Sequence, residues 1–226
     1  MAAVLTCLTV AAAVTGCAGG TGTEEASAGQ MLDRANATMK ALRSVTIDGD
    51  TAPTAGGGYT SHQTTDLKGR CASKVTWDTG AGLEQIRIGD TDYVRPNRVY
   101  LERWSGRSAA GTKDQKRWVR TPVSKARAED GLAACTWPFA SFGSATKGGR
   151  TKVGDKPAIA LAVTDKADKA GHYTFYVATE GKPYLLKVVY KGPDYQNTIS
   201  FSAFDEPLNV RPPARTDVLD ASAAGH

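Results

Sequence analysis

The sequence predicts an α+β fold in which an amphipathic helix precedes an antiparallel β-sheet. In the segment near 30–45, apolar residues recur at three- and four-residue spacing, as on one face of a helix. Beyond residue 45, short runs rich in Val, Ile, Thr, Tyr and Phe alternate with Gly, Asp, Asn and Pro. This texture is typical of strands joined by tight turns. The 226 residues suffice to bury a core of ordinary size.

Residues 1–16 read MAAVLTCLTVAAAVTG and contain no charged side chain. The apolar run is too short to cross a membrane but fits the apolar region of a secretory signal. The sequence therefore predicts a lipoprotein signal peptide over 1–16. Signal peptides normally carry Lys or Arg before the apolar run, but no Lys or Arg stands between Met1 and the apolar run here. We therefore expect the natural start to lie upstream of Met1.

The stretch Val14-Thr15-Gly16-Cys17 resembles the lipobox of bacterial lipoproteins. The resemblance implies that the Cys17 sulfur receives a diacylglycerol and that the chain is cut just before it. Residues 17–28 are rich in Gly, Thr, Ser and Ala, a composition that predicts a flexible tether. We therefore expect the protein on the extracytoplasmic face of the cell membrane, with the membrane as its partner through the lipid anchor.

The first helix is predicted to begin after Ser27, which is a suitable N-cap residue. Its apolar stripe is expected to pack in the core and consists of Met31, Leu32, Ala35, Met39, Leu42 and Val45.

Strands are predicted near 45–50, 59–68, 73–79, 83–89, 91–95, 116–120, 150–154, 157–164, 171–178, 184–191 and 196–204. Two weaker helical segments are predicted near 96–106 and 124–135. No linker or shift in composition interrupts this region, so we predict one domain over 29–213. Residues 214–226 are small and polar enough to predict a disordered C-terminal tail.

Two cysteines, Cys71 and Cys135, remain when Cys17 carries lipid and the signal peptide is removed. An exported protein meets oxidising conditions, which favours a disulfide between them. Closing so long a loop stabilises the fold by about 4 kcal/mol in the chain-entropy model. The alternatives are a catalytic thiol, which would need His62 or His172 beside it, and a metal site, for which the cysteine spacing is unsuitable.

The sequence lacks a G-x-S-x-G elbow, a P-loop and a G-x-G-x-x-G fingerprint. We therefore predict that the protein is not an enzyme and that it uses no cofactor and no metal. The net charge of +5 comes from Lys and Arg scattered along the chain rather than gathered in a basic run with aromatics. Nucleic acid is accordingly not expected as a partner.

Several segments together resemble actinobacterial lipoproteins related to LppX, LprA, LprF and LprG. The order and spacing of these segments match over about 30–213. The segments are Asp66–Cys71, Ile86–Asp90 with Tyr93–Pro96, Lys116–Val119, Gly181–Val188 and Phe201–Pro207.

That family is similar in fold to the carriers LolA and LolB. The resemblance implies a strongly curved antiparallel sheet, an incomplete β-barrel, with helices packed on its concave side around a hydrophobic cavity. It also implies a lipid or lipoglycan as the ligand, because some members carry such molecules. The residues expected to line the cavity are Trp77, Ile86, Ile88, Tyr93, Trp104, Trp118, Phe139, Tyr173 and Phe175.

We therefore predict a membrane-anchored exported lipoprotein that binds or carries a hydrophobic ligand in a half-barrel cavity. Two alternatives stay open at this point. The same rings could fill an ordinary core and leave no cavity. The protein could also be a structural or sensory envelope lipoprotein that binds another protein and has no cargo; the sequence does not identify such a partner.

Overall fold

A computed structural model describes residues 26–105, 117–125 and 131–220 of the chain. The predicted signal peptide and Cys17 lie outside the described residues. Within those ranges, no helix is long and apolar enough to cross a membrane.

Helix α1 (Ala28–Lys40) begins directly after Ser27, as predicted. The Ser27 hydroxyl accepts a hydrogen bond from the Gln30 backbone N–H at 3.2 Å, and the Gln30 side chain accepts one from the Ser27 N–H at 2.8 Å. This reciprocal capping box satisfies two backbone donors at the helix start. Leu32 and Met39 of the predicted stripe are almost fully buried.

All eleven predicted strands occur, with shifted ends, and a twelfth follows them. The strands are β1 (Val45–Pro53), β2 (Tyr59–Thr65), β3 (Arg70–Trp77), β4 (Gly82–Ile88), β5 (Thr91–Pro96), β6 (Trp118–Pro122), β7 (Ser144–Val153), β8 (Lys156–Thr164), β9 (His172–Ala178), β10 (Leu185–Lys191), β11 (Tyr195–Ser202) and β12 (Val218–Asp220). The largest shift is in β7, whose first half contains Gly148 and Gly149 at a register irregularity. That half lacks the apolar residues by which a strand is recognised.

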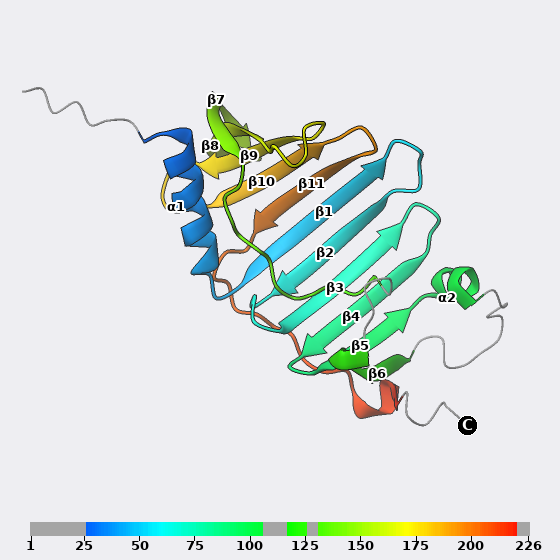
Figure 1. Cartoon of the computed structure of the whole chain (residues 1–226). Coiled ribbons are helices and arrows are strands. Elements are labelled where there is room, and N and C mark those ends of the chain that lie inside the picture. The colour runs from blue at the N-terminus through cyan, green and yellow to red at the C-terminus, as the bar shows by residue number, and fades with distance from the viewer. Residues whose placement is uncertain (1–25, 106–116, 126–130, 221–226) are drawn as a thin grey trace, which may run out of the picture.

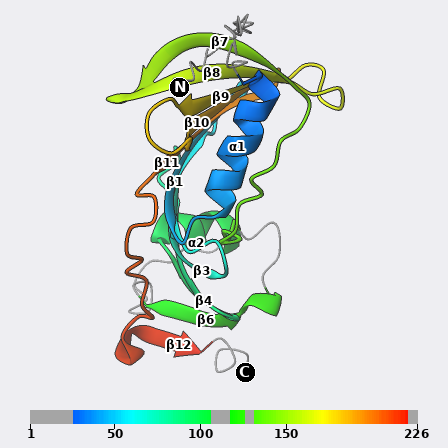
Figure 2. The same cartoon turned by 90° about the vertical axis from the view of Figure 1, so that its left-hand side faces the viewer.

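The described strands form one sheet in the order β12-β6-β5-β4-β3-β2-β1-β11-β10-β9-β8-β7 (Figure 1). Neighbouring strands are antiparallel except β12 and β6, which are parallel. The end strands β12 and β7 do not pair with each other, so the sheet stays open. It is curved, and α1 lies on its concave side (Figure 2). The predicted α+β fold with an incomplete barrel is confirmed.

The main core lies between α1 and the concave face of β1 and β8–β11. Side chains alternate between the two faces of a strand, so Val45 and Ile47 of β1 point toward the helix while Asp48 does not. The fully or nearly fully buried members of this core include Leu32, Met39, Val45, Leu161, Val163, Val177 and Leu185. Burial of this apolar surface is the main term that holds α1 to the sheet.

The second helix, α2 (Arg98–Ser105), confirms the helix predicted near 96–106. Tyr100 of α2 packs on Trp77 of β3, with ring centroids 5.6 Å apart. The helix predicted near 124–135 is wrong for the described residues. Only Val123–Lys125 forms a short 3₁₀ turn (η2) there, and 131–135 has no regular secondary structure.

The prediction of a disordered tail from residue 214 is also wrong for the described part. Arg215–Asp217 forms a 3₁₀ turn (η4), and β12 then pairs with β6. The Arg117 side chain donates hydrogen bonds of 3.1 Å to the carbonyl oxygens of Thr216 and Val218. Composition missed this strand because two apolar residues suffice at a sheet edge that offers unpaired backbone groups.

Candidate ligand-binding site

An extended segment, residues 131–143, crosses the concave face from β4 to β7 (Figure 1). We call it the strap. Cys135 in the strap forms a disulfide with Cys71 of β3, with Cα atoms 5.4 Å apart, as predicted. The Thr65 hydroxyl donates to the Cys135 carbonyl oxygen at 2.5 Å. One end of the strap is therefore fixed to the sheet by a covalent bond and a buried hydrogen bond.

A buried polar network on β4 and β5 holds the same end of the strap. The Asp92 carboxylate is fully buried and accepts hydrogen bonds from Arg87 at 2.8 and 2.7 Å and from Gln85 at 2.8 Å. Gln85 also exchanges two hydrogen bonds with the backbone of Ala133, and Arg87 donates to the Ala134 carbonyl oxygen. Each buried polar group is thereby paired, which offsets the free-energy cost of removing it from water.

The other end of the strap enters β7 through a tight turn at Gly143. The φ of Gly143 is +62°, and a Cβ atom there would collide with the carbonyl oxygen of Thr164. Only glycine fits both conditions. Strap position is therefore set at both ends, by Cys135 and by Gly143.

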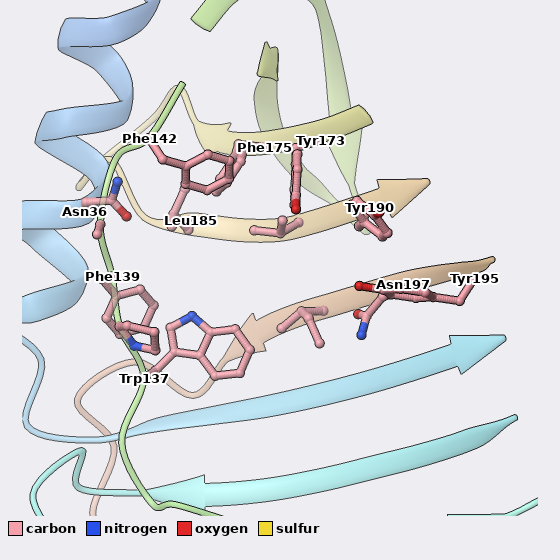
Figure 3. A pocket seen from close by; sticks show the side chains of 14 residues that line it. Asn36, Trp137, Phe139, Phe142, Tyr173, Phe175, Leu185, Tyr190, Tyr195 and Asn197 are labelled. Carbon is pink, nitrogen blue, oxygen red and sulfur yellow. The ribbon is translucent and has the colours of Figure 1, made fainter. Parts of the chain in front are cut away.

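Between these ends the strap covers a pocket of about 300 Å³ on the concave face of β9–β11, beside α1 (Figure 3). None of the lining residues is a Lys, Arg, His, Asp or Glu. The lining residues are Asn36, Trp137, Pro138, Phe139, Ala140, Phe142, Tyr173, Phe175, Leu185, Val188, Tyr190, Tyr195, Asn197 and Ile199. The volume is at the lower end of the range for small-molecule sites.

The floor of the pocket is a cross-strand row. Phe175 of β9 pairs with Val188 of β10, which pairs with Ile199 of β11. The next residue in that row is Gly49 of β1, where a Cβ would collide with Ser61 and press on Ile199. Glycine at this position lets the neighbouring Ile199 side chain keep its place in the floor.

Aromatic rings form the roof and the end near α1. The ring of Phe142 lies edge-on to Tyr173 and Phe175, with centroids 4.9 and 5.7 Å away. Trp137 lies edge-on to Phe201 at 5.7 Å. At the helix the Asn36 amide donates to the Ser141 hydroxyl at 3.0 Å, which ties the strap to α1.

Tyrosines surround the opposite end, which we call the mouth of the pocket and define by Tyr173, Tyr190, Tyr195 and Asn197. Tyr190 lies between Tyr173 and Tyr195, with centroid distances of 4.7 and 4.8 Å. Tyr195 is 41% exposed, so this end faces solvent. Figure 3 shows Tyr190, Tyr195 and Asn197 gathered there, away from α1.

Of the nine residues predicted to line a cavity, three line this pocket: Phe139, Tyr173 and Phe175. Trp77 also lies on the concave side but packs against Tyr59 and Tyr100 at the α2 end of β3. Trp104 belongs to α2, and its side chain lies outside the described part of the structure. Cys17, the predicted lipid anchor, lies outside the described residues as well.

The prediction for Ile86, Ile88, Tyr93 and Trp118 is corrected by the strand register. Gln85 and Arg87 occupy the concave face of β4, so the alternating Ile86 and Ile88 lie on the convex face. Ile86 pairs there with Tyr93, which borders the C-terminal segment at Pro212 and Pro213. The ring of Trp118 lies under the Arg95 guanidinium at 4.5 Å. At these positions polar side chains lie on the inner face and apolar side chains on the outer face, the reverse of an apolar core. The strap explains this, because its backbone supplies hydrogen-bond partners on the inner face.

Most residues of the pocket floor and mouth were not predicted from the sequence. Leu185, Val188, Tyr190, Tyr195 and Ile199 were not singled out, although alternation in β10 and β11 places Val188 with Tyr190 and Asn197 with Ile199 on one face. To recognise this shared face one must know the relative register of the two strands, which the sequence alone does not give.

Comparison with known proteins supports the fold. No protein-family model matches the chain, and no curated protein sequence matches it. Among solved structures, lipoprotein LppX from Mycobacterium tuberculosis matches with a TM-score of 0.55 and 14% identity, over 80% of this chain and 96% of LppX. LprF from Mycobacterium bovis matches with a TM-score of 0.57 and 15% identity, over 83% of this chain and 97% of LprF. The chain therefore has the LppX- and LprF-like fold that the sequence motifs predicted.

Proposed function

We propose that this protein is an exported lipoprotein, anchored to the membrane through Cys17, that binds an apolar ligand in the pocket beneath the strap. The observation that carries the proposal is the pocket itself. It is lined by aromatic and aliphatic side chains with two asparagines, and no side chain that is charged at neutral pH contributes to it.

The energetics of such a site favour a lipid or a similar molecule. Each methylene of an acyl chain that leaves water for the pocket contributes about 0.8 kcal/mol to binding. The rings of Trp137, Phe142 and Phe175 offer a preformed surface, so little side-chain entropy is lost when a ligand enters. This role needs no nucleophile or general base, and a binding protein rather than an enzyme is the function we propose.

Anchoring is supported by the lipobox-like Val14–Cys17 stretch and by the place where the folded body begins. Helix α1 starts at Ala28, so the body begins soon after the predicted lipidated residue. LppX, one of the matched structures, is described as a lipoprotein. Two or more acyl chains on one cysteine would give stable attachment, which a single chain does not.

Native mass spectrometry of the protein purified from its own membranes tests the ligand. We expect a complex that loses an apolar molecule of defined mass when organic solvent is added. Repeated recovery of empty protein, together with a co-purifying protein partner, would instead favour a role without cargo.

The anchor is tested separately, by mass analysis of the N-terminal peptide and by fractionation of a Cys17→Ser variant. We expect a diacylglycerol mass on Cys17 and loss of the variant from the membrane fraction. An unmodified Cys17 in native protein would contradict the lipid anchor and would leave the proposed ligand-binding pocket unaffected.

A further inference from the structure

The polar groups of the pocket are not spread evenly. Asn36, at the α1 end, already donates to Ser141. Apart from the indole N–H of Trp137, the other polar groups of the lining side chains belong to the four residues of the mouth: Tyr173, Tyr190, Tyr195 and Asn197. A ligand with one polar end would therefore place that end at the mouth and its apolar part toward Trp137.

The hydroxyl hydrogen of one mouth tyrosine, Tyr173, is directed at Asp168 rather than at a ligand. The Tyr173 hydroxyl donates to the Asp168 carboxylate at 3.3 Å, and the negative charge of the same carboxylate acts on the Tyr190 phenol. A phenol has a single hydrogen to donate. Once that hydrogen is shared with Asp168, only the lone pairs of the Tyr173 oxygen remain for a ligand.

Asn197 adds another acceptor. Its amide nitrogen donates to the Thr51 hydroxyl at 3.0 Å. Its side-chain oxygen is buried and has no hydrogen-bond partner among the described residues. An unpaired buried carbonyl oxygen costs free energy, which a donor on a ligand would recover.

The electrostatics of the mouth agree with this reading. Removal from water and the nearby Asp168 carboxylate raise the pKa of Tyr190 to about 12. Burial and the Asp168 charge also raise the pKa of Tyr173. Both phenols stay protonated at neutral pH, and the negatively charged carboxylate of Asp168 lies behind them.

We propose that the ligand is a single-chain amphiphile with an uncharged, hydroxyl-bearing head, held with its hydroxyl groups on the acceptor oxygens of the mouth and its chain between Trp137 and Ile199. Hydroxyl groups can donate to these oxygens, whereas a carboxylate or phosphate can only accept and would face the Asp168 charge. The pocket volume of about 300 Å³ suits one chain rather than several. This inference rests on the proposed binding function.

The test is displacement of the neutral fluorescent probe N-phenyl-1-naphthylamine from the full, disulfide-bonded chain. The competitors are 1-dodecanoylglycerol and dodecanoate, which share a chain and differ in the head. We expect the glycerol ester to displace the probe at a concentration about tenfold lower, the effect of one lost hydrogen bond and like-charge repulsion.

Two variants locate the discrimination at the mouth. Asp168→Asn should lower the displacing concentration of dodecanoate and leave that of the ester nearly unchanged, because it removes the negative charge and keeps one side-chain oxygen as an acceptor. Asn197→Leu should weaken the ester alone. The matched control is Asp155→Asn, in the β7–β8 turn, which should change neither competitor.

The outcomes separate the two proposals. Equal or better displacement by dodecanoate would overturn the choice of an uncharged head while leaving the binding function in place. Absence of binding by the probe and by both competitors would overturn the binding function and this inference with it.

Discussion

Cys71 and Cys135 are bonded although 64 positions separate them in the sequence, and their bond joins the centre of the sheet to the strap that roofs the pocket. The same strap residue is held through its backbone by Thr65. The disulfide therefore stabilises the fold and also fixes one end of the pocket roof.

Replacement of both cysteines by alanine should lower the free energy of unfolding by about 4 kcal/mol, because the unfolded chain regains the entropy of a long loop. Urea unfolding without reductant measures this loss. Wild-type protein in reductant is the control and should resemble the double variant. A loss below about 1 kcal/mol would mean that the polar network alone holds the strap.

The buried network makes a second prediction. Asp92→Ala leaves the Arg87 guanidinium buried without its carboxylate partner and should cost about 3–5 kcal/mol of unfolding free energy. The matched control is Glu84→Ala, which breaks the 2.6 Å pair with Arg95, where both side chains are more than a third exposed. That loss should stay below about 1 kcal/mol. Equal losses of unfolding free energy in the two variants would show that the buried Arg87–Asp92 pair stabilises the fold no more than the exposed Glu84–Arg95 pair.

The phenol of Tyr190 gives a pH prediction. Its folded-state pKa of about 12 lies above the ordinary value of 10.0, so folding favours the protonated form. The stabilisation is complete below pH 10 and is lost as the pH rises toward 12. Absorbance titration of wild type minus a Tyr190→Phe variant should show one phenol that ionises near pH 12. A difference curve centred near pH 10 would contradict the contact with Asp168.

The fold was predictable because its signals are local. Each strand has its own run of β-branched and aromatic residues between turn residues, and Ser27 with Gln30 forms a capping box within four residues. The exceptions have physical reasons. The start of β7 around Gly148 lacks apolar residues, and β12 forms only because the edge of β6 is open to it.

The candidate site was less predictable because it depends on non-local register. Apolar residues of β4 and β5 were expected inside, but the inner face there carries Gln85 and Arg87 as partners of the strap backbone. The local sequence near Ile86 does not indicate that a strap, which begins more than forty residues later, covers this strand. Phe139 lies in the strap, and Tyr173 and Phe175 lie on the inner face of β9, so these three predicted rings do line the pocket.

The proposed function requires that the space between Val188 and the strap is hollow and takes up an apolar ligand. Val188→Trp would fill it, whereas Val189→Trp places the same ring on the other face of β10, since Val189 alternates with Val188 along the strand. Circular dichroism and urea unfolding would confirm that both variants fold.

Binding of N-phenyl-1-naphthylamine to this pair of variants is the most direct test. We expect Val188→Trp to weaken binding of the probe about tenfold or more and Val189→Trp to leave its affinity within about twofold of wild type. Equal affinity of the two folded variants and the wild type would contradict the claim that this pocket is the binding site.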